Sequence, residues 1–173
     1  MSKVAVPLIA LVICYGFFFV YVSKSYDDLP ASVATHFDLQ GQPDGWMSRE
    51  SCVAFTLGLG LVMPAFIVVV MAGASRIPVS FINVPHRDYW LAPKRKQAAV
   101  AILQRYSLWF ACMNVLFVTG LHWLTVQANQ AGLASRQLVP HLSGAGLALI
   151  AGGFVAGTVV WLVLLLRRFS KIS

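Results

Sequence analysis

The sequence predicts an all-α, polytopic membrane protein with four transmembrane helices and a structured extracytoplasmic first loop. Three observations support this fold class. The chain of 173 residues is 58% hydrophobic and only 11% charged. Its mean hydropathy of +0.74 lies far above that of a soluble domain. Four segments also reach the roughly 20 apolar residues that a helix needs to cross a hydrocarbon core of about 30 Å.

The four predicted spans are uninterrupted apolar runs within a single membrane domain. They contain no Asp, Glu, Lys or Arg, and they cover residues 4–22, 52–74, 107–126 and 142–166. Backbone groups in lipid must be satisfied within their own segment, so runs of this length are helices and not barrel strands of about 10 residues. We interpret the first run as a retained anchor, because it is longer than an ordinary signal-peptide core and no clear small-residue cleavage site follows it.

Charge divides the connections into two kinds. The loop at 23–51 is acidic, whereas the loop at 75–106 and the tail after residue 166 are basic. By the positive-inside rule, the basic loop and both termini are cytoplasmic, and the loops at 23–51 and 127–141 face outward. We therefore expect a multi-pass protein of the bacterial cytoplasmic (inner) membrane. The lipid bilayer is its expected partner, and no nucleic acid is expected because no aromatic and basic platform accompanies the charge.

The first outer loop is rich in turn-forming residues. Residues 29–37 are expected to form a short helix that starts at Pro30. Gly41 and the run Pro43-Asp44-Gly45 then supply turns, because Pro presets φ, Asp bonds nearby backbone and Gly accepts a positive φ. Trp46 follows as an amphipathic ring suited to the headgroup level. The loop is therefore expected to be structured and to present these side chains outward.

Two blocks of the sequence resemble one bacterial family. The first block is Leu29-Pro30, His36-Phe37, Gly41 and Pro43-Asp44-Gly45-Trp46, and the second is the run 83–95, NVPHRDYWLAPKR. In this order they resemble the SdpI-like integral membrane proteins, most of which are known only as a domain of unknown function with the signature LPxxxPxHFxxxGxPDGW. The resemblance covers about residues 1–105. It departs at Ala34, where the signature has Pro, and at Lys94, where the second block has Glu.

The resemblance implies binding and not catalysis. The best-known SdpI-like proteins are longer, protect their host from a secreted peptide toxin and can sequester a repressor at the membrane. A peptide toxin or envelope component would then contact the outer loop through His36, Phe37, Asp38, Gly41, Pro43, Asp44 and Trp46. On the cytoplasmic side, a regulator would contact Asp88, Tyr89, Trp90 and Arg95. Asp88 is also expected to pair with Arg87, Lys94 or Arg95.

Three histidines raise a metal-site alternative. The predicted topology places His36, His122 and His141 at the outer face, beside several carboxylates. Imidazole and carboxylate are suitable ligands for Zn²⁺ or Cu²⁺, so a metal-dependent envelope enzyme is one possible function. No HExxH pair supports it, and each histidine also has a structural interpretation. No other cofactor is expected, and an enzyme is not the default because no catalytic triad order or intramembrane carboxylate pair is present.

The fourth predicted span carries a stripe of small residues. Gly144, Ala148 and Gly152 are spaced by four, which is the small-xxx-small pattern of closely packed membrane helices. The stripe predicts a tight contact, either within the bundle or with another membrane protein. The second alternative would make the chain an accessory subunit of a larger membrane complex.

Overall fold

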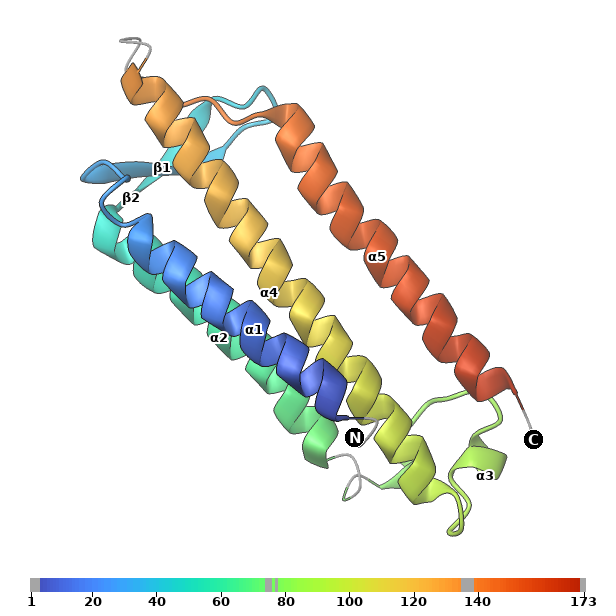
Figure 1. The fold of residues 1–173 in the computed structure, drawn as a ribbon. Helices are drawn as coiled ribbons and strands as arrows, with labels where there is room; N and C mark the ends of the chain where they lie inside the picture. The colour runs from blue at the N-terminus through green and yellow to red at the C-terminus, as the bar shows by residue number, and fades with distance from the viewer. Residues whose placement is uncertain (1–3, 74–75, 77, 135–138, 172–173) are drawn as a thin grey trace.

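Four long helices form the protein, as the sequence predicts (Figure 1). The computed structural model describes residues 4–73, 76, 78–134 and 139–171. Within them, α1 (Ala5–Lys24), α2 (Arg49–Ala72), α4 (Lys96–Ala134) and α5 (Gly144–Ser170) are long and apolar enough to cross a membrane. The all-α, multi-pass class is therefore confirmed. Both ends of the described chain lie at the same end of the bundle (Figure 1).

Helix α4 is the element whose limits differ most from the predicted span at 107–126. It has 39 residues, and at 1.5 Å per residue it extends about 58 Å, nearly twice the hydrocarbon thickness of about 30 Å. Polar residues flank the apolar part of α4. They mark the limits of the predicted span, but the helix continues through them. Parts of the predicted loops at 75–106 and 127–141 are therefore helical extensions.

Helix α4 is also the centre of the packing, since α1, α2 and α5 all lie against it. The core between α1 and α4 contains the fully buried side chains of Phe18, Val22 and Val115. Helix α2 approaches this core closely at Gly60, where a Cβ atom would lie 2.2 Å from the Phe18 ring. The three helices α1, α2 and α4 thus form one packed unit, with α5 added along α4.

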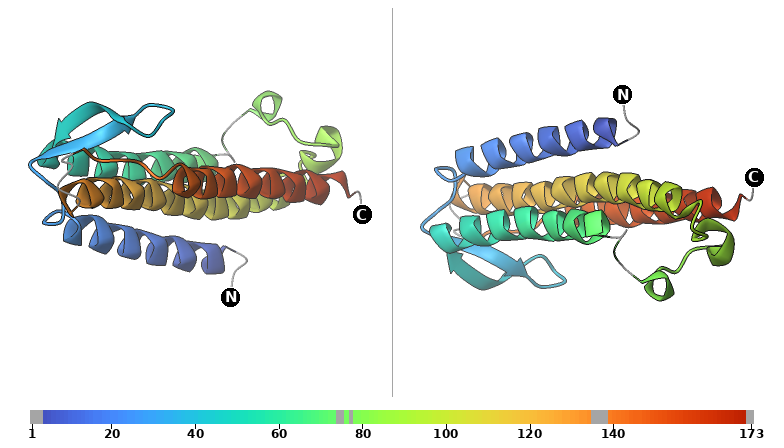
Figure 2. Two further views of the ribbon diagram at one scale, coloured as in Figure 1. Left: turned by 90° about the horizontal axis from the view of Figure 1, so that it is seen from above. Right: turned by 90° about the horizontal axis from the view of Figure 1, so that it is seen from below.

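The first loop is a β-hairpin and not the predicted short helix at 29–37. Strand β1 (Ser32–Phe37) pairs antiparallel with β2 (Pro43–Ser48), with Ala34 opposite Trp46. Val33 and Ala34 are buried against the helices, so contacts distant in the sequence decide the local conformation. Strand β2 leads directly into α2, whose N-cap Ser48 accepts a hydrogen bond from the Ser51 backbone N–H at 3.2 Å. The hairpin lies on the side of the bundle opposite to α1 (Figure 2).

At the other end of the bundle, the second block of the resemblance, residues 83–95, folds against α4 and α5. It contains the short helix α3 (Arg87–Trp90), and the 3-10 turn η2 (Val79–Phe81) precedes it. Trp90 is buried, and its indole N–H donates to the carbonyl of Phe169 at 2.7 Å. The two rings also meet edge to face, with centroids 5.3 Å apart. This contact fixes the last turn of α5.

In the described parts of the chain, the small-residue stripe of α5 faces outward. Gly144, Ala148 and Gly152 are exposed, and a Cβ atom at either glycine would meet nothing within 4 Å. Helix α5 instead turns the opposite side toward α4, where Ile150 contacts Gly120. At about 100° per residue, Ile150 lies roughly opposite Ala148 on the helix. The intramolecular alternative for the stripe is wrong, and the partner alternative stays a prediction.

Candidate functional site

The hairpin is held in place by one side chain of α4. Asn129 is 1% exposed, and its amide accepts from the Ala34 backbone N–H at 2.9 Å and donates to the Ala34 carbonyl at 3.0 Å. An amide placed in this way satisfies both polar groups of Ala34, much as a neighbouring strand would. The edge of β1 is therefore partly occupied. No strand in the described ranges pairs with the outer edge of β2.

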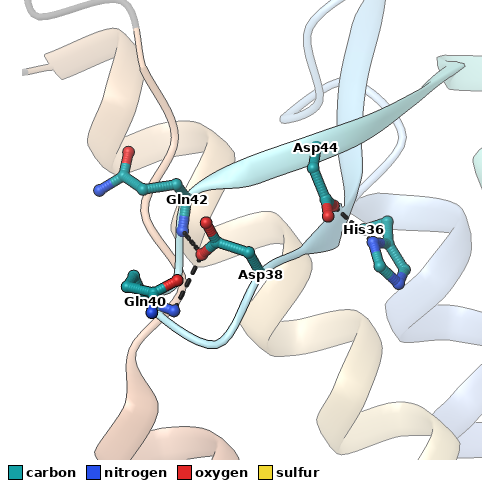
Figure 3. Close-up of polar contacts among 5 residues, drawn as sticks. All are labelled: His36, Asp38, Gln40, Gln42 and Asp44. Atoms are coloured by element: carbon teal, nitrogen blue, oxygen red, sulfur yellow. Dashed lines mark hydrogen bonds and ion pairs between the residues drawn. The ribbon is translucent and has the colours of Figure 1, made fainter.

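The turn between the strands is built around Asp38 (Figure 3). Its carboxylate accepts from the backbone N–H groups of Gln40 at 2.9 Å and Gln42 at 2.8 Å. Gly41 adopts a φ of +79°, and a Cβ atom there would lie 2.7 Å from the carbonyl oxygen of Leu142. The Leu142 backbone N–H also donates to the Gly41 carbonyl at 3.0 Å. Asp38 and Gly41 thus shape the turn and fasten it to the segment before α5.

His36 and Asp44 face each other across the hairpin. The Nδ1 atom of His36 is hydrogen-bonded to the Asp44 carboxylate (Figure 3). A carboxylate only accepts, so Nδ1 carries the proton in this pair. The two side chains are 75% and 49% exposed, and an ion pair at such a surface contributes about 0–1 kcal/mol. Asp44 therefore orients the imidazole from a strand position and is not the turn residue that the sequence predicts.

His122 occupies a different environment, inside the bundle. It is 3% exposed, and its Nε2 lies 2.8 Å from Ser25 Oγ while its Nδ1 lies 3.3 Å from Thr56 Oγ1. The Ser25 hydroxyl donates to the Val22 carbonyl at 2.9 Å, so Ser25 accepts from Nε2–H. Nδ1 then accepts from Thr56. One neutral imidazole thus joins α1, α2 and α4 in a single directed chain of hydrogen bonds.

A cavity of about 330 Å³ lies between the hairpin, α2 and α4. His36 and Met47 of the hairpin line it together with His122 of α4. The rest of the lining is mainly apolar and includes Phe55 and Leu59 of α2. An apolar cavity with a few polar groups is the usual form of a small binding site. The two histidines therefore share a cavity although each has its own hydrogen-bond partners.

The exposed surface of the hairpin end combines acids with large apolar side chains. Trp46, Met47 and Leu39 are 50%, 39% and 102% exposed. The five carboxylates at this end are all exposed, and they are Asp27, Asp28, Asp38, Asp44 and Glu50. Tyr26 donates to Glu50 at 3.0 Å, and this bond raises the pKa of the Tyr26 hydroxyl above its ordinary value. The surface is suited to a ligand with positive charge and apolar groups.

The predicted three-histidine metal site is not assembled. Both ring nitrogens of His122 are engaged within the bundle. His141 is exposed before α5 and accepts from the Gln42 side chain at 3.3 Å. Among the described residues, no group of three His, Cys, Asp or Glu side chains is placed to hold a metal ion. The geometry therefore gives the metal-enzyme alternative no support.

The predicted cytoplasmic contact residues divide into buried and exposed ones. Trp90 is a core residue, so it is not available to a partner as the sequence suggested. Arg95 stacks over the ring of Tyr89 at 4.0 Å. Asp88 is exposed, and no ion pair joins it to Arg87, Lys94 or Arg95 in the part of the chain that the structure describes. Asp88 and Arg95 are the members of the set that remain on the surface.

Three residues that organise this end of the protein were not singled out from the sequence. They are the hydrogen-bonding partners Ser25, Thr56 and Asn129, all of them buried. Polar side chains inside apolar helices are costly and usually have a partner or a function. Thr56 carries that signal in the sequence, whereas Asn129 lies beyond the predicted span at 107–126. The partners of both residues lie far along the chain.

Comparison with known proteins bears on the first part of the chain. A family described as "Domain of unknown function (DUF1648)" matches residues 4–68, which is less than half of the 173 residues. The match contains α1, the hairpin and most of α2. No curated protein and no solved structure matches the chain. The matched region thus includes the hairpin but not the helix that anchors it.

Proposed function

We propose that this chain is a non-enzymatic membrane protein that binds a peptide through its hairpin. The observation that carries the proposal is a hairpin that is fixed to α4 on one side and has a free strand edge on the other. Asn129 holds β1, whereas β2 (Pro43–Ser48) has no second strand neighbour in the described ranges. An extended peptide can add to such an edge through backbone hydrogen bonds, with alternate side chains giving specificity.

The chemistry of the surface selects a cationic, amphipathic peptide. Asp38 and Asp44 lie on the hairpin, and the remaining carboxylates of this end lie close to it along the chain. Trp46 and Met47 supply apolar contacts on β2 itself. The cavity lined by His36 and Met47 offers a place for one apolar side chain of the ligand. Complementary charge increases the association rate and excludes acidic competitors.

Toxin immunity is the biological role that we propose on the resemblance to SdpI-like proteins. The chain would lie in the bacterial inner membrane with both termini and the basic end in the cytoplasm. The hairpin would then meet a secreted peptide toxin or another envelope component. A regulator could be held at the basic end by Asp88 and Arg95, which remain exposed.

Binding is tested in nanodiscs of zwitterionic lipid, so that the bilayer itself does not attract charged peptides. The probes are two synthetic peptides of the same length with alternating Lys and Val or alternating Glu and Val. We expect the Lys peptide to bind and Trp46→Ala to weaken it by about tenfold, since exposed aromatic residues often dominate such contacts. Trp123→Ala is the matched control, because Trp123 is 45% exposed on α4. Equal binding of both peptides, or no effect of Trp46→Ala, would contradict the proposal.

Immunity is tested separately in cells that produce a peptide toxin. We expect His36→Ala and Trp46→Ala to abolish protection while the protein still reaches the membrane. Protection that survives both substitutions would show that the hairpin is not the contact. If the wild type itself gives no protection, the immunity role is wrong. The nanodisc assay then decides by itself whether the hairpin binds a peptide.

A role as an accessory subunit is the second candidate, and the exposed stripe on α5 favours it. Gly144, Ala148 and Gly152 lie on the side of α5 opposite to α4, and the apolar stretch of this helix has no fully buried residue among the described parts of the chain. Small residues allow another membrane helix to approach closely. We expect co-purification of a stoichiometric partner in mild detergent that is lost in Ala148→Leu but kept in Ala101→Leu on α4. A clean monomer would reject this role.

A further inference from the structure

A groove lies between α1, α4 and α5 in the half of the bundle that contains the chain ends. Its volume is about 660 Å³, and its lining is mostly apolar. Helix α1 contributes Val6, α4 contributes Trp109 and Met113, and α5 contributes Gly157 and Leu164. All three helices are long and apolar enough to cross a membrane, so the groove faces lipid along most of its length.

Arg105 brings a positive charge into this groove. Its side chain lines the wall and is half-buried, with the guanidinium 5.5 Å from the centre of the Tyr106 ring. Within the described ranges, no carboxylate forms an ion pair with it. A cation held against an apolar wall without a counterion is an unfavourable arrangement unless an anion from outside the chain completes it.

The chain supplies almost no acid for this purpose. It has six acidic residues, and five of them lie at the hairpin end of the bundle, far from Arg105 along the helices. The sixth, Asp88, is exposed on α3. Among the described residues, no acid is therefore placed to neutralise Arg105, which points to an anion from the surroundings.

A second cation, Arg167, lies on α5 one turn beyond the groove-lining residue Leu164. Arg167 follows Val160 and Leu164 on α5 by seven and three residues, so the three lie on one side of the helix. Val160 and Leu164 line the groove. Arg167 is exposed at the end of α5, at the level where the apolar lining stops. The groove thus has a cationic mouth and an apolar body.

We propose that this groove binds one anionic phospholipid. The phosphate or acidic headgroup contacts Arg105 and Arg167, and an acyl chain lies along the apolar wall toward Met113 and Gly157. Arginine suits this role because its planar guanidinium donates two parallel hydrogen bonds to a phosphate. Basic pockets between membrane helices are a recurrent form of anionic lipid site.

Gly157 gives the acyl chain its room and offers a second way to test the site. A Cβ atom at Gly157 would lie 2.9 Å from the terminal methyl of Met113, on the wall of the groove. A leucine at this position would occupy the apolar body while leaving both arginines in place. Loss of lipid in Gly157→Leu would therefore report on the acyl chain, and loss in Arg105→Gln would report on the headgroup.

The experiment is native mass spectrometry of the full chain in detergent, titrated with phosphatidylglycerol or with phosphatidylcholine of identical acyl chains. We expect one tightly retained phosphatidylglycerol and at least about tenfold weaker retention of phosphatidylcholine. Arg105→Gln should weaken the binding of phosphatidylglycerol by about tenfold, because one charge-assisted contact is lost. Arg87→Gln is the matched control, because Arg87 is exposed on α3, and it should bind as the wild type does.

Folding is checked by size-exclusion chromatography of each variant, and Gly157→Leu supplies the second test if Arg105→Gln aggregates. Equal retention of the two lipids would overturn the proposal, as would wild-type retention in both Arg105→Gln and Gly157→Leu. Inorganic phosphate at the same concentration should not displace the lipid. Displacement by phosphate would show a free-anion site and would also overturn the proposal.

Discussion

Replacing Asn129 by Leu tests whether one buried amide holds the hairpin in place. Leu has the same number of side-chain heavy atoms as Asn and the same branching, but it cannot bond the backbone of Ala34, which is fully buried. The substitution therefore leaves one buried N–H and one buried carbonyl without partners. Each such group costs about 1–3 kcal/mol, so the docked hairpin should lose about 2–6 kcal/mol of free energy relative to an open state.

Hydrogen exchange of the protein in nanodiscs measures this loss directly. If exchange proceeds through opening of the hairpin, 2 kcal/mol corresponds to about a thirtyfold drop in protection of residues 32–37. Asn129→Asp keeps the acceptor for the Ala34 N–H but loses the donor, so its effect should be intermediate. The matched control is Asn114→Leu, because Asn114 donates within α4 to the Phe110 carbonyl at 2.9 Å and does not touch the hairpin. Unchanged protection of β1 in Asn129→Leu would refute the reasoning.

Three further predictions concern the bundle. His122→Phe removes both hydrogen bonds of the imidazole, and we expect about 1–3 kcal/mol of lost stability, measured as a lower midpoint of thermal unfolding in detergent. Gly60→Ala places a Cβ atom 2.2 Å from the Phe18 ring, so it should lower that midpoint too, whereas Gly58→Ala, which meets nothing within 4 Å, should not. Trp90→Phe loses the 2.7 Å bond to the carbonyl of Phe169 and should increase amide exchange in the last turn of α5 by about tenfold; exchange that stays at the wild-type rate would show that α5 does not depend on this contact.

The four helices were predictable because crossing lipid imposes a simple requirement. Length and apolar composition determine whether a segment can span, and neither depends on distant contacts. The ends of α4 were not predictable in the same way. Polar residues beyond the hydrocarbon core end the hydropathy signal, but nothing in them stops a helix, which continues to Ala134.

The hairpin shows where local inference fails. Pro30 at the start of residues 29–37 is compatible with a helix, and the register of β1 with β2 includes irregularities at His36. The strand exists because Asn129, 95 positions from Ala34, and strand β2 satisfy its backbone. A tertiary contact of this kind has no local signature. Gly41 was predicted correctly as a turn residue, since a positive φ is a local property of glycine. The carboxylate that bonds the turn backbone is that of Asp38, and not that of Asp44 as predicted.

The helix-packing stripe shows a different limit. The spacing of Gly144, Ala148 and Gly152 identifies one side of a helix that tolerates close approach, but it does not say what approaches. Larger side chains such as Phe154 and Trp161 make the contacts with α4 instead. The sequence therefore identifies a side of α5 that is lined by small residues, but it does not identify the neighbour that packs against this side.

The central claim is that the hairpin end binds a cationic peptide along the outer edge of β2. It is tested most directly by hydrogen exchange of the wild-type protein in zwitterionic nanodiscs, with and without the peptide of alternating Lys and Val. The account predicts added protection in residues 43–48, with little change at the basic end of the bundle, and no added protection with the Glu peptide. Peptide-dependent protection that appears elsewhere, or none at residues 43–48 under saturating peptide, would contradict it.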